Sequence, residues 1–187
     1  MTPIFDFDAE VKRYEALKFN IYDELKSRPK DFCTENRMLY PGKFYVFKYV
    51  TDTKKLFDLH PIVLSLGPSD TNPRSFHCLN LKYMPKPVRL KVLGYIFKIY
   101  SREISQSVDK FPLSTESVKQ PPIFTCNYEA VNALLKDLGW RQALHKYLAT
   151  GIVECYDINY TMVPGLALDD TNTFINGTIV EAQTPKK

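Results

Sequence analysis

The side chains of this sequence that are best suited to bind a partner are basic, and they gather in one stretch. Residues 74–110 contain 8 lysine or arginine residues against 2 acidic ones, with aromatic residues such as Tyr83 and Tyr95 among them. Ammonium and guanidinium groups bind phosphate oxygens, so the stretch predicts a surface for nucleic acid or for an acidic protein. A solvated basic face without a partner is the alternative, because helices on ordinary domains often have this composition.

Within this stretch, six residues are the predicted contacts to double-stranded DNA: Arg74, Lys86, Arg89, Lys91, Lys98 and Arg102. On an α-helix with 100° per residue, Lys91, Lys98 and Arg102 fall within roughly 40° of each other. They therefore predict one basic stripe. Its affinity for duplex DNA would not depend on base sequence and would fall steeply with added salt.

Residue types that serve in catalysis are few and scattered. The chain has 3 histidines, at positions 60, 77 and 145, and its 4 cysteines form no C-x-x-C pair. His77 and Cys78 are adjacent on a predicted strand, where neighbouring side chains point to opposite faces, so they form no dyad. Walker, G-x-G-x-x-G, G-x-S-x-G and H-E-x-x-H motifs are not found. We expect a binding or structural protein without metal, cofactor or small-molecule substrate. An enzyme is the third class, since triads assemble in space.

Composition and cysteine usage favour a soluble globular protein. The chain has 187 residues, 44% of them hydrophobic, and a formal net charge of +4, which together predict one domain with a sizeable core. We expect the cysteines to be structural thiols in a reducing compartment, with a disulfide or a metal site as alternatives. No secretory signal is evident at the start. No apolar run approaches the ~18 residues of a membrane span, which predicts no membrane contact.

The predicted elements begin with a sheet. Aromatic and β-branched residues at 43–50 predict a strand with Phe44 and Val46 on one face and Tyr45, Phe47 and Tyr49 on the other. With strands at 61–67 and 76–84, it makes a three-stranded core over 43–84. A last pair of strands is expected at 152–163 and 173–180, separated by a turn-rich segment at 164–172.

Helices are predicted on the flanks of this sheet. One opens at residues 85–87, where proline is tolerated in a first turn. A second helical region spans about 127–149, bent or divided at Gly139, with Leu144, Tyr147 and Leu148 continuing its apolar pattern. The fold class is therefore α+β: a small antiparallel sheet or partly closed barrel flanked by helices.

Residues 1–40 are predicted to form a helical arm and linker, ahead of a single α+β domain at 41–187. An apolar stripe recurs there at steps of three or four residues, and it is the predicted partner interface: Val11, Tyr14, Leu17, Ile21 and Leu25. Asp6 or Asp8 can cap the start of this helix. The stripe is narrow, so packing on its own domain and packing on another subunit both remain open.

Several segments resemble a family of tailed-bacteriophage virion proteins from T-even-like myoviruses. They are PGKFYVFKY at 41–49, LHPIVL at 59–64 and HCLNLKYMP at 77–85, followed by Arg89 and Leu90. Weaker echoes lie in LHKYL at 144–148 and in residues 158–164. The most specific part is LNLKYMP at 79–85. Lys82 stands where the family usually has histidine, and the loop at 68–74 lacks the usual glycines.

The resemblance implies a non-enzymatic structural component of the virion, at the neck, connector or baseplate, made in the host cytoplasm. Its partners would be other virion proteins, in a symmetric ring. Members of this family are often labelled DNA-end protectors. The alternative implied function is therefore a DNA-end-binding protein that protects the terminus of the packaged genome.

Overall fold

The structure is a computed structural model that describes residues 6–17, 38–50, 60–108 and 128–168, with the backbone alone described for 99–108 and 154. The described helices are α1 (Phe7–Leu17), α3 (Lys86–Val108), α4 (Tyr128–Asp137) and α5 (Val163–Leu168). The described strands are β1 (Phe44–Tyr49), β2 (Ile62–Ser69), β3 (Asn72–Asn80), β4 (Leu144–Leu148) and β5 (Ile152–Ile158). Short 3-10 turns are η2 (Leu81–Tyr83), η3 (Arg141–Ala143), η4 (Ala149–Gly151) and η5 (Tyr160–Met162).

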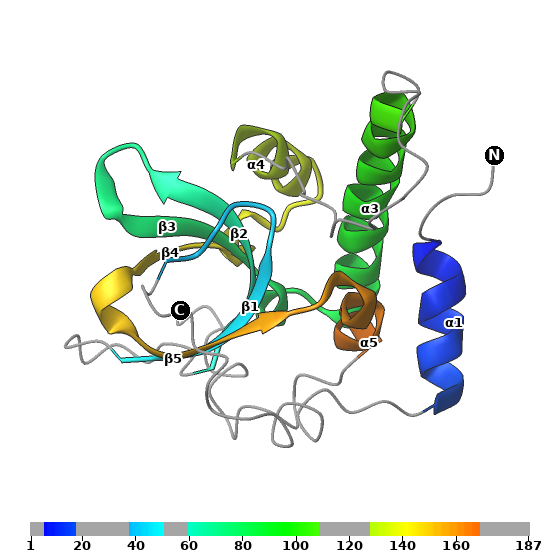
Figure 1. Ribbon diagram of the computed structural model, residues 1–187, viewed down its shortest axis with the longest axis horizontal. Coiled ribbons are helices and arrows are strands. Elements are labelled where there is room, and N and C mark those ends of the chain that lie inside the picture. The colour runs from blue at the N-terminus through cyan, green and yellow to red at the C-terminus, as the bar shows by residue number, and fades with distance from the viewer. Residues whose placement is uncertain (1–5, 18–37, 51–59, 109–127, 169–187) are drawn as a thin grey trace.

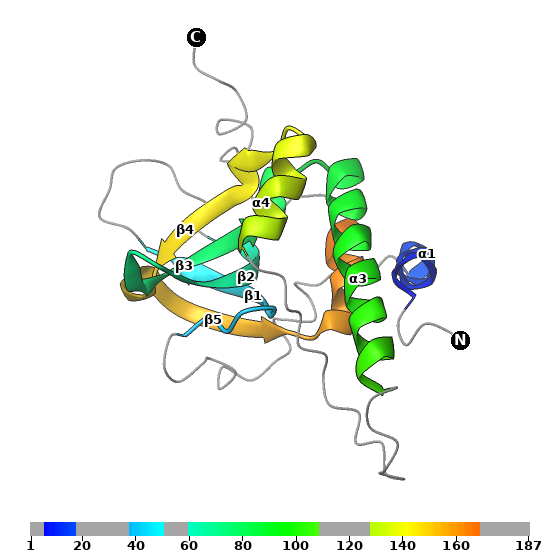
Figure 2. The ribbon, with the colours of Figure 1, turned by 90° about the horizontal axis from the view of Figure 1, so that it is seen from above.

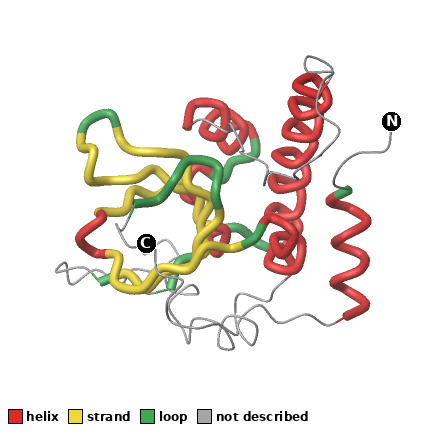
Figure 3. Tube along the Cα trace, in the orientation of Figure 1, coloured by secondary structure: helices red, strands yellow, loops and turns green. Residues whose placement is uncertain are grey.

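The strands form one antiparallel sheet in the order β4-β3-β2-β1-β5. The three strands predicted at 43–84 are its centre, and β4 and β5 extend it on either side. Figures 1 and 3 show the strands on one side of the molecule and helices α1, α3 and α5 on the other. The predicted α+β class, with an antiparallel, partly closed sheet and an N-terminal helix, is confirmed.

The sheet is buried on both faces, and the apolar side chains of β1 divide between them as the predicted alternation requires. Phe44 and Val46 join an outer core under the helices, while Tyr45, Phe47 and Tyr49 join a second cluster on the other face. The rings of Phe47 and Tyr49 lie 5.1 and 5.0 Å from the ring of Tyr147 on β4, although two strands separate β1 from β4 in the sheet. The sheet therefore curls around this inner cluster as a half-barrel.

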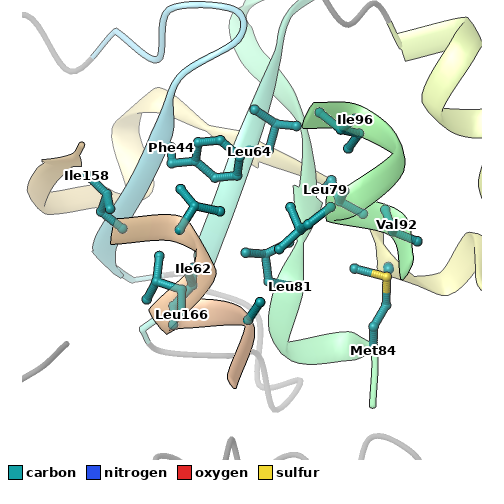
Figure 4. Close-up of a cluster of buried hydrophobic side chains, with 14 of the residues drawn as sticks. Phe44, Ile62, Leu64, Leu79, Leu81, Met84, Val92, Ile96, Ile158 and Leu166 are labelled. Atoms are coloured by element: carbon teal, nitrogen blue, oxygen red, sulfur yellow. The ribbon is translucent and has the colours of Figure 1, made fainter. Parts of the chain in front are cut away.

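The outer core lies between the sheet and the helices. Figure 4 shows Phe44, Leu64 and Leu79 from the strands facing Val92 and Ile96 of α3 and Leu166 of α5. Each of these side chains is at most 2% exposed, which makes this layer the main apolar contribution to stability. Figure 2 shows α3 beside the sheet, running across the direction of β5, with α1 on its far side. Among the described helices, none has the length and apolar character needed to cross a membrane.

α1 packs on its own domain. The ring of Phe7 stacks on Phe97 of α3 with centroids 4.9 Å apart, and the Tyr14 hydroxyl donates to the carbonyl of Thr161 at 3.0 Å. The Asp6 carboxylate accepts from the N–H of Ala9 at 3.1 Å, so of the two predicted capping residues Asp6 takes the role. Of the predicted N-terminal arm, α1 thus contributes Phe7 and Tyr14 to the buried side chains of the domain.

The region predicted as helical at 127–149 is a helix only in its first half. α4 ends at Asp137, and Gly139 adopts a φ of 76°. The N–H groups of Gly139 and Trp140 donate to carbonyls of the last helical turn at 3.1 and 2.8 Å, so the glycine caps the helix and does not bend it. The predicted helical continuation to about residue 149 was wrong. The chain there forms β4, because the free edge of β3 pairs with it.

Other boundaries also differ from the prediction. β3 begins at Asn72 and ends at Asn80, where the 3-10 turn η2 replaces the end of the strand predicted at 76–84. β5 ends at Ile158, and α5 takes up part of the segment predicted as turns at 164–172. Burial fixes this helix, since every residue from Val163 to Ala167 is buried. The strand predicted at 173–180 lies outside the described residues.

Candidate nucleic-acid interface

α3 presents one apolar side to the core and one basic side to solvent. Its described apolar side consists of Val92, Leu93, Ile96 and Phe97, all at most 2% exposed. Lys91, Tyr95 and Lys98 are exposed. At 100° per residue they lie within roughly 60° of each other, opposite the apolar side. We call these three residues the α3 outer face.

The α3 outer face is positively charged without internal compensation. No carboxylate occurs in the sequence between Lys86 and Lys98. Within the described part of the chain, neither Lys91 nor Lys98 forms an ion pair. Their Cα atoms are separated by ~10 Å along the helix axis, so both ammonium groups can contact one extended anion. Arg102 continues the stripe by the same helical arithmetic, and its side chain is not among those described.

Arg89 does not belong to this surface, although it stands two residues before Lys91. It is 2% exposed, and its guanidinium donates to the carbonyls of Leu166 at 3.0 Å and Met84 at 3.4 Å. These bonds join the start of α3 to α5. The prediction that Arg89 contacts DNA was wrong, because the side chain is enclosed in the protein and its two terminal nitrogens donate to backbone carbonyls.

The remaining predicted basic residues lie apart from the α3 outer face. Lys86 is exposed at the first turn of α3, about 140° around the helix from Lys91. Arg74 is exposed near the start of β3, beside the β2–β3 hairpin turn. Its backbone N–H donates to the side-chain oxygen of Asn72 at 2.9 Å. In Figures 1 and 2 this hairpin lies on the opposite side of the molecule from α3. The structure thus brings together Lys91 and Lys98, and not the whole predicted set.

The segment 79–85, which carries the resemblance, is a buried corner between β3 and α3. The Asn80 side chain accepts from the N–H of Lys82 at 3.0 Å and donates to the hydroxyl of Tyr147 at 2.9 Å. Lys82 is 1% exposed, and its ammonium donates to the carbonyl of His60. The side chains of Asn80 and Lys82 therefore hold the corner that sets the direction of α3.

The predicted N-terminal partner stripe is divided in the structure. Tyr14 is buried against its own domain and Val11 is half-buried, whereas Leu17 is 64% exposed. Ile21 and Leu25 lie outside the described residues. Within the described part, the stripe therefore packs mainly inside the molecule, and Leu17 is its one side chain open to solvent.

His77 and Cys78 point to opposite faces of β3, as predicted. The Cys78 thiol is fully buried in the inner cluster, and this burial raises its pKa well above the ordinary value. The His77 ring contacts Tyr128 of α4 with centroids 4.3 Å apart. Burial, and to a lesser extent the neighbouring Lys146, lowers the pKa of His77. Among the described residues, no group of three histidine, cysteine or acidic side chains is placed to hold a metal ion.

The sequence analysis named Tyr95 among the aromatic residues of the basic stretch but did not include it in the predicted DNA contacts. The residue is 51% exposed, and it lies between Lys91 one turn before it and Lys98 one turn after it. The signal was present in the spacing, because residues separated by four and by three positions share one helix face. A polar and aromatic side chain in this position is one that could contact a ligand held by the lysines.

Comparisons with protein-family models, with curated proteins and with solved structures gave no match to this chain. Proposals about its function therefore rest on its residues, their geometry and the resemblance in sequence described above.

Proposed function

We propose that this chain is a non-enzymatic structural component of a tailed-phage virion, located at the neck, connector or baseplate. The resemblance centred on LNLKYMP at 79–85 supports the proposal, because these residues direct one strand into one helix and so define the fold of the domain. A fixed corner of this kind is what members of one structural family would share while their surfaces differ.

The observation that carries the assembly role is an apolar surface around η4. Leu148 and Val153 flank this turn and are 45% and 51% exposed, and Val50, which is 50% exposed, donates its N–H to the carbonyl of Gly151 within it. We call Val50, Leu148 and Val153 the η4 patch. It lies at the turn that connects β4 and β5, the two edge strands of the sheet. Exposed apolar groups beside free strand edges are suited to contact with other proteins.

The test of this proposal uses particles of the phage that encodes the chain. Mass spectrometry of purified particles should find the chain at a fixed ratio to the other virion proteins. Val153→Lys supplied from a plasmid should fold normally yet be depleted from particles, because a charge in the η4 patch opposes apolar contact. Leu17→Lys makes the same change at the exposed residue of the predicted N-terminal stripe, so depletion of that variant in place of Val153→Lys would assign the contact to α1. Absence of the wild-type chain from particles refutes the proposal, and normal incorporation of Val153→Lys refutes this surface.

A second candidate function is binding of the terminus of double-stranded DNA through the α3 outer face. The observation in its favour is that Lys91 and Lys98 are exposed on one side of a helix without a carboxylate between them. Each phosphate contact on a duplex contributes about 0.9 to the slope of log affinity against log salt. Loss of both lysines should therefore reduce that slope by about 1.8.

Exonuclease protection of linear duplex DNA tests this function, with a sealed circle as competitor and at ~50 and ~200 mM salt. Protection that survives the circle supports end binding. The double variant Lys91→Gln/Lys98→Gln should lose protection. Lys12→Gln/Lys136→Gln removes the same charge from exposed positions on α1 and α4 and should retain it. Equal protection by both double variants excludes the α3 outer face.

A further inference from the structure

Tyr95 is the feature of the α3 outer face that phosphate binding leaves unexplained. Half of its side chain is exposed, while the neighbouring large apolar residues of α3 are at most 2% exposed. Lysine contacts to a duplex backbone would need no aromatic ring between them. We infer that the α3 outer face binds nucleic acid segments with unpaired bases, with Tyr95 stacking on a base while Lys91 and Lys98 hold the flanking phosphates. The inference rests on the second candidate function above.

The chemistry follows from what an exposed ring can reach. In a duplex the bases are already stacked and paired, so the ring could contact only the backbone or the last pair. An unpaired nucleotide offers a free base face, and base–aromatic stacking tolerates any base because each has a π surface. The lysines lie one turn to either side of Tyr95, a spacing that lets one strand pass over the ring with phosphates on both sides. The combination therefore favours unpaired nucleotides over duplex.

An acidic protein surface would satisfy the charge of Lys91 and Lys98 equally well. It would not, however, depend on a planar ring, since hydrogen bonding or simple burial would serve at position 95. Replacement of Tyr95 by phenylalanine and by leucine therefore separates the two partners. Stacking is retained in Tyr95→Phe and lost in Tyr95→Leu, whereas both variants keep an apolar side chain. Because Tyr95 is outside the core, neither change should alter the fold.

Fluorescence anisotropy tests the inference at a single salt concentration, with labelled oligo-dT, oligo-rU and a blunt duplex hairpin whose strands are joined by a non-nucleotide linker, so that the hairpin has no unpaired bases. The wild-type chain should bind at least one of the single strands more tightly than the hairpin. Comparison of oligo-dT with oligo-rU shows whether the preferred ligand is DNA or RNA. Tyr95→Leu should weaken single-strand binding about 5- to 140-fold, the range expected for loss of one stacked base. It should leave hairpin binding unchanged. Tyr95→Phe should bind as the wild type does, and thermal unfolding should be the same for all three proteins.

The outcomes separate this inference from the candidate function on which it rests. If Lys91→Gln/Lys98→Gln abolishes hairpin binding while Tyr95→Leu affects no ligand, the inference is overturned and DNA binding by the face stands. Equal loss of single-strand and hairpin binding in Tyr95→Leu also overturns it, because stacking on unpaired bases would not act on both. If the wild-type chain binds no nucleic acid, both proposals fail.

Discussion

Replacing Arg89 should destabilise the protein, whereas replacing Lys91 should not, although the two residues stand two positions apart on one helix. Arg89 is 2% exposed and donates to the carbonyls of Leu166 and Met84. Arg89→Ala removes both donors and the packing of the aliphatic stem. Lys91→Ala removes a solvated ammonium from the α3 outer face.

The magnitude follows from the two carbonyls that lose a donor. Each buried polar group left without its partner costs about 1–3 kcal/mol, so Arg89→Ala should lower the free energy of unfolding by about 2–6 kcal/mol. The total free energy of unfolding of native domains is about 5–15 kcal/mol, so the Arg89→Ala protein could be largely unfolded. Arg89→Lys keeps the charge but loses the planar fork that reaches both carbonyls, and should cost about 1–3 kcal/mol. Lys91→Ala should stay within about 0.5 kcal/mol of the wild type.

Urea denaturation measures these differences, followed by far-ultraviolet circular dichroism and by the fluorescence of Trp140. This is the only tryptophan of the chain, and it packs against the outer core. The milder Arg89→Lys keeps the test decisive if Arg89→Ala does not fold. If Arg89→Lys and Arg89→Ala had the free energy of unfolding of the wild type, the structural role of Arg89 would be refuted. Arg89 would then again be a candidate for DNA contact.

Three further predictions concern stability. Gly151→Ala should cost about 1–3 kcal/mol in urea denaturation, since its Cβ would lie 2.6 Å from the Tyr49 ring. In Gly94→Ala the new Cβ would lie 3.6 Å from the ring of Phe7, which is an ordinary contact. This replacement inside a helix should raise the free energy of unfolding by about 0.5–1 kcal/mol, and a decrease would contradict the packing of α1 on α3. His77 has a pKa lowered by burial and by Lys146 from its ordinary 6.5, so below that pH the unfolded chain gains a proton that the fold resists. The free energy of unfolding should therefore decrease as pH falls through 6.5, and this contribution should level off below the pKa of His77 in the folded protein. His77→Gln should remove this pH dependence. A His77→Gln protein with the pH profile of the wild type would contradict the prediction.

Local patterns were sufficient for β1 and α3. The alternation Phe44 to Tyr49 separates two sets of side chains, and the structure places them in two different clusters. The angular spacing of Lys91 and Lys98 predicted one exposed face of a helix, and both side chains are exposed. In each case a period of 2.0 or 3.6 residues decides which side chains share a face, and that period can be read from the sequence alone.

The sequence could also have excluded Arg89 from the basic surface. At 100° per residue it lies on the same side as Val92 and Ile96, about 160° from Lys91. Charge density along the chain grouped it with its exposed neighbours, although its angular position places it among apolar residues. Its carbonyl partner Leu166 is 77 positions away, a contact that no local pattern contains.

β4 could not be predicted from its own five residues. The sequence LHKYL continues an apolar helical period from α4, and a short run of this kind fits either structure. What decides is the free edge of β3, whose Phe76 pairs with Tyr147. The α5 helix is similar, since Pro164 and Gly165 give no helical signal and only burial on the outer core holds it. Long-range packing overrides local preference in both elements.

The two proposed surfaces can act at the same time, because they face away from each other. The turn between β4 and β5 lies on the opposite side of the molecule from α3 in both Figure 1 and Figure 2. The outer core and the sheet separate Val153 from Lys91 and Lys98, so changes at the two places should be additive. The triple variant Val153→Lys/Lys91→Gln/Lys98→Gln should therefore be depleted from particles to the same degree as Val153→Lys. Its affinity for nucleic acid should fall to the same degree as that of Lys91→Gln/Lys98→Gln. If Val153→Lys failed to bind nucleic acid, the two activities would instead depend on one shared surface. The chain could then not bind a virion protein and nucleic acid at the same time.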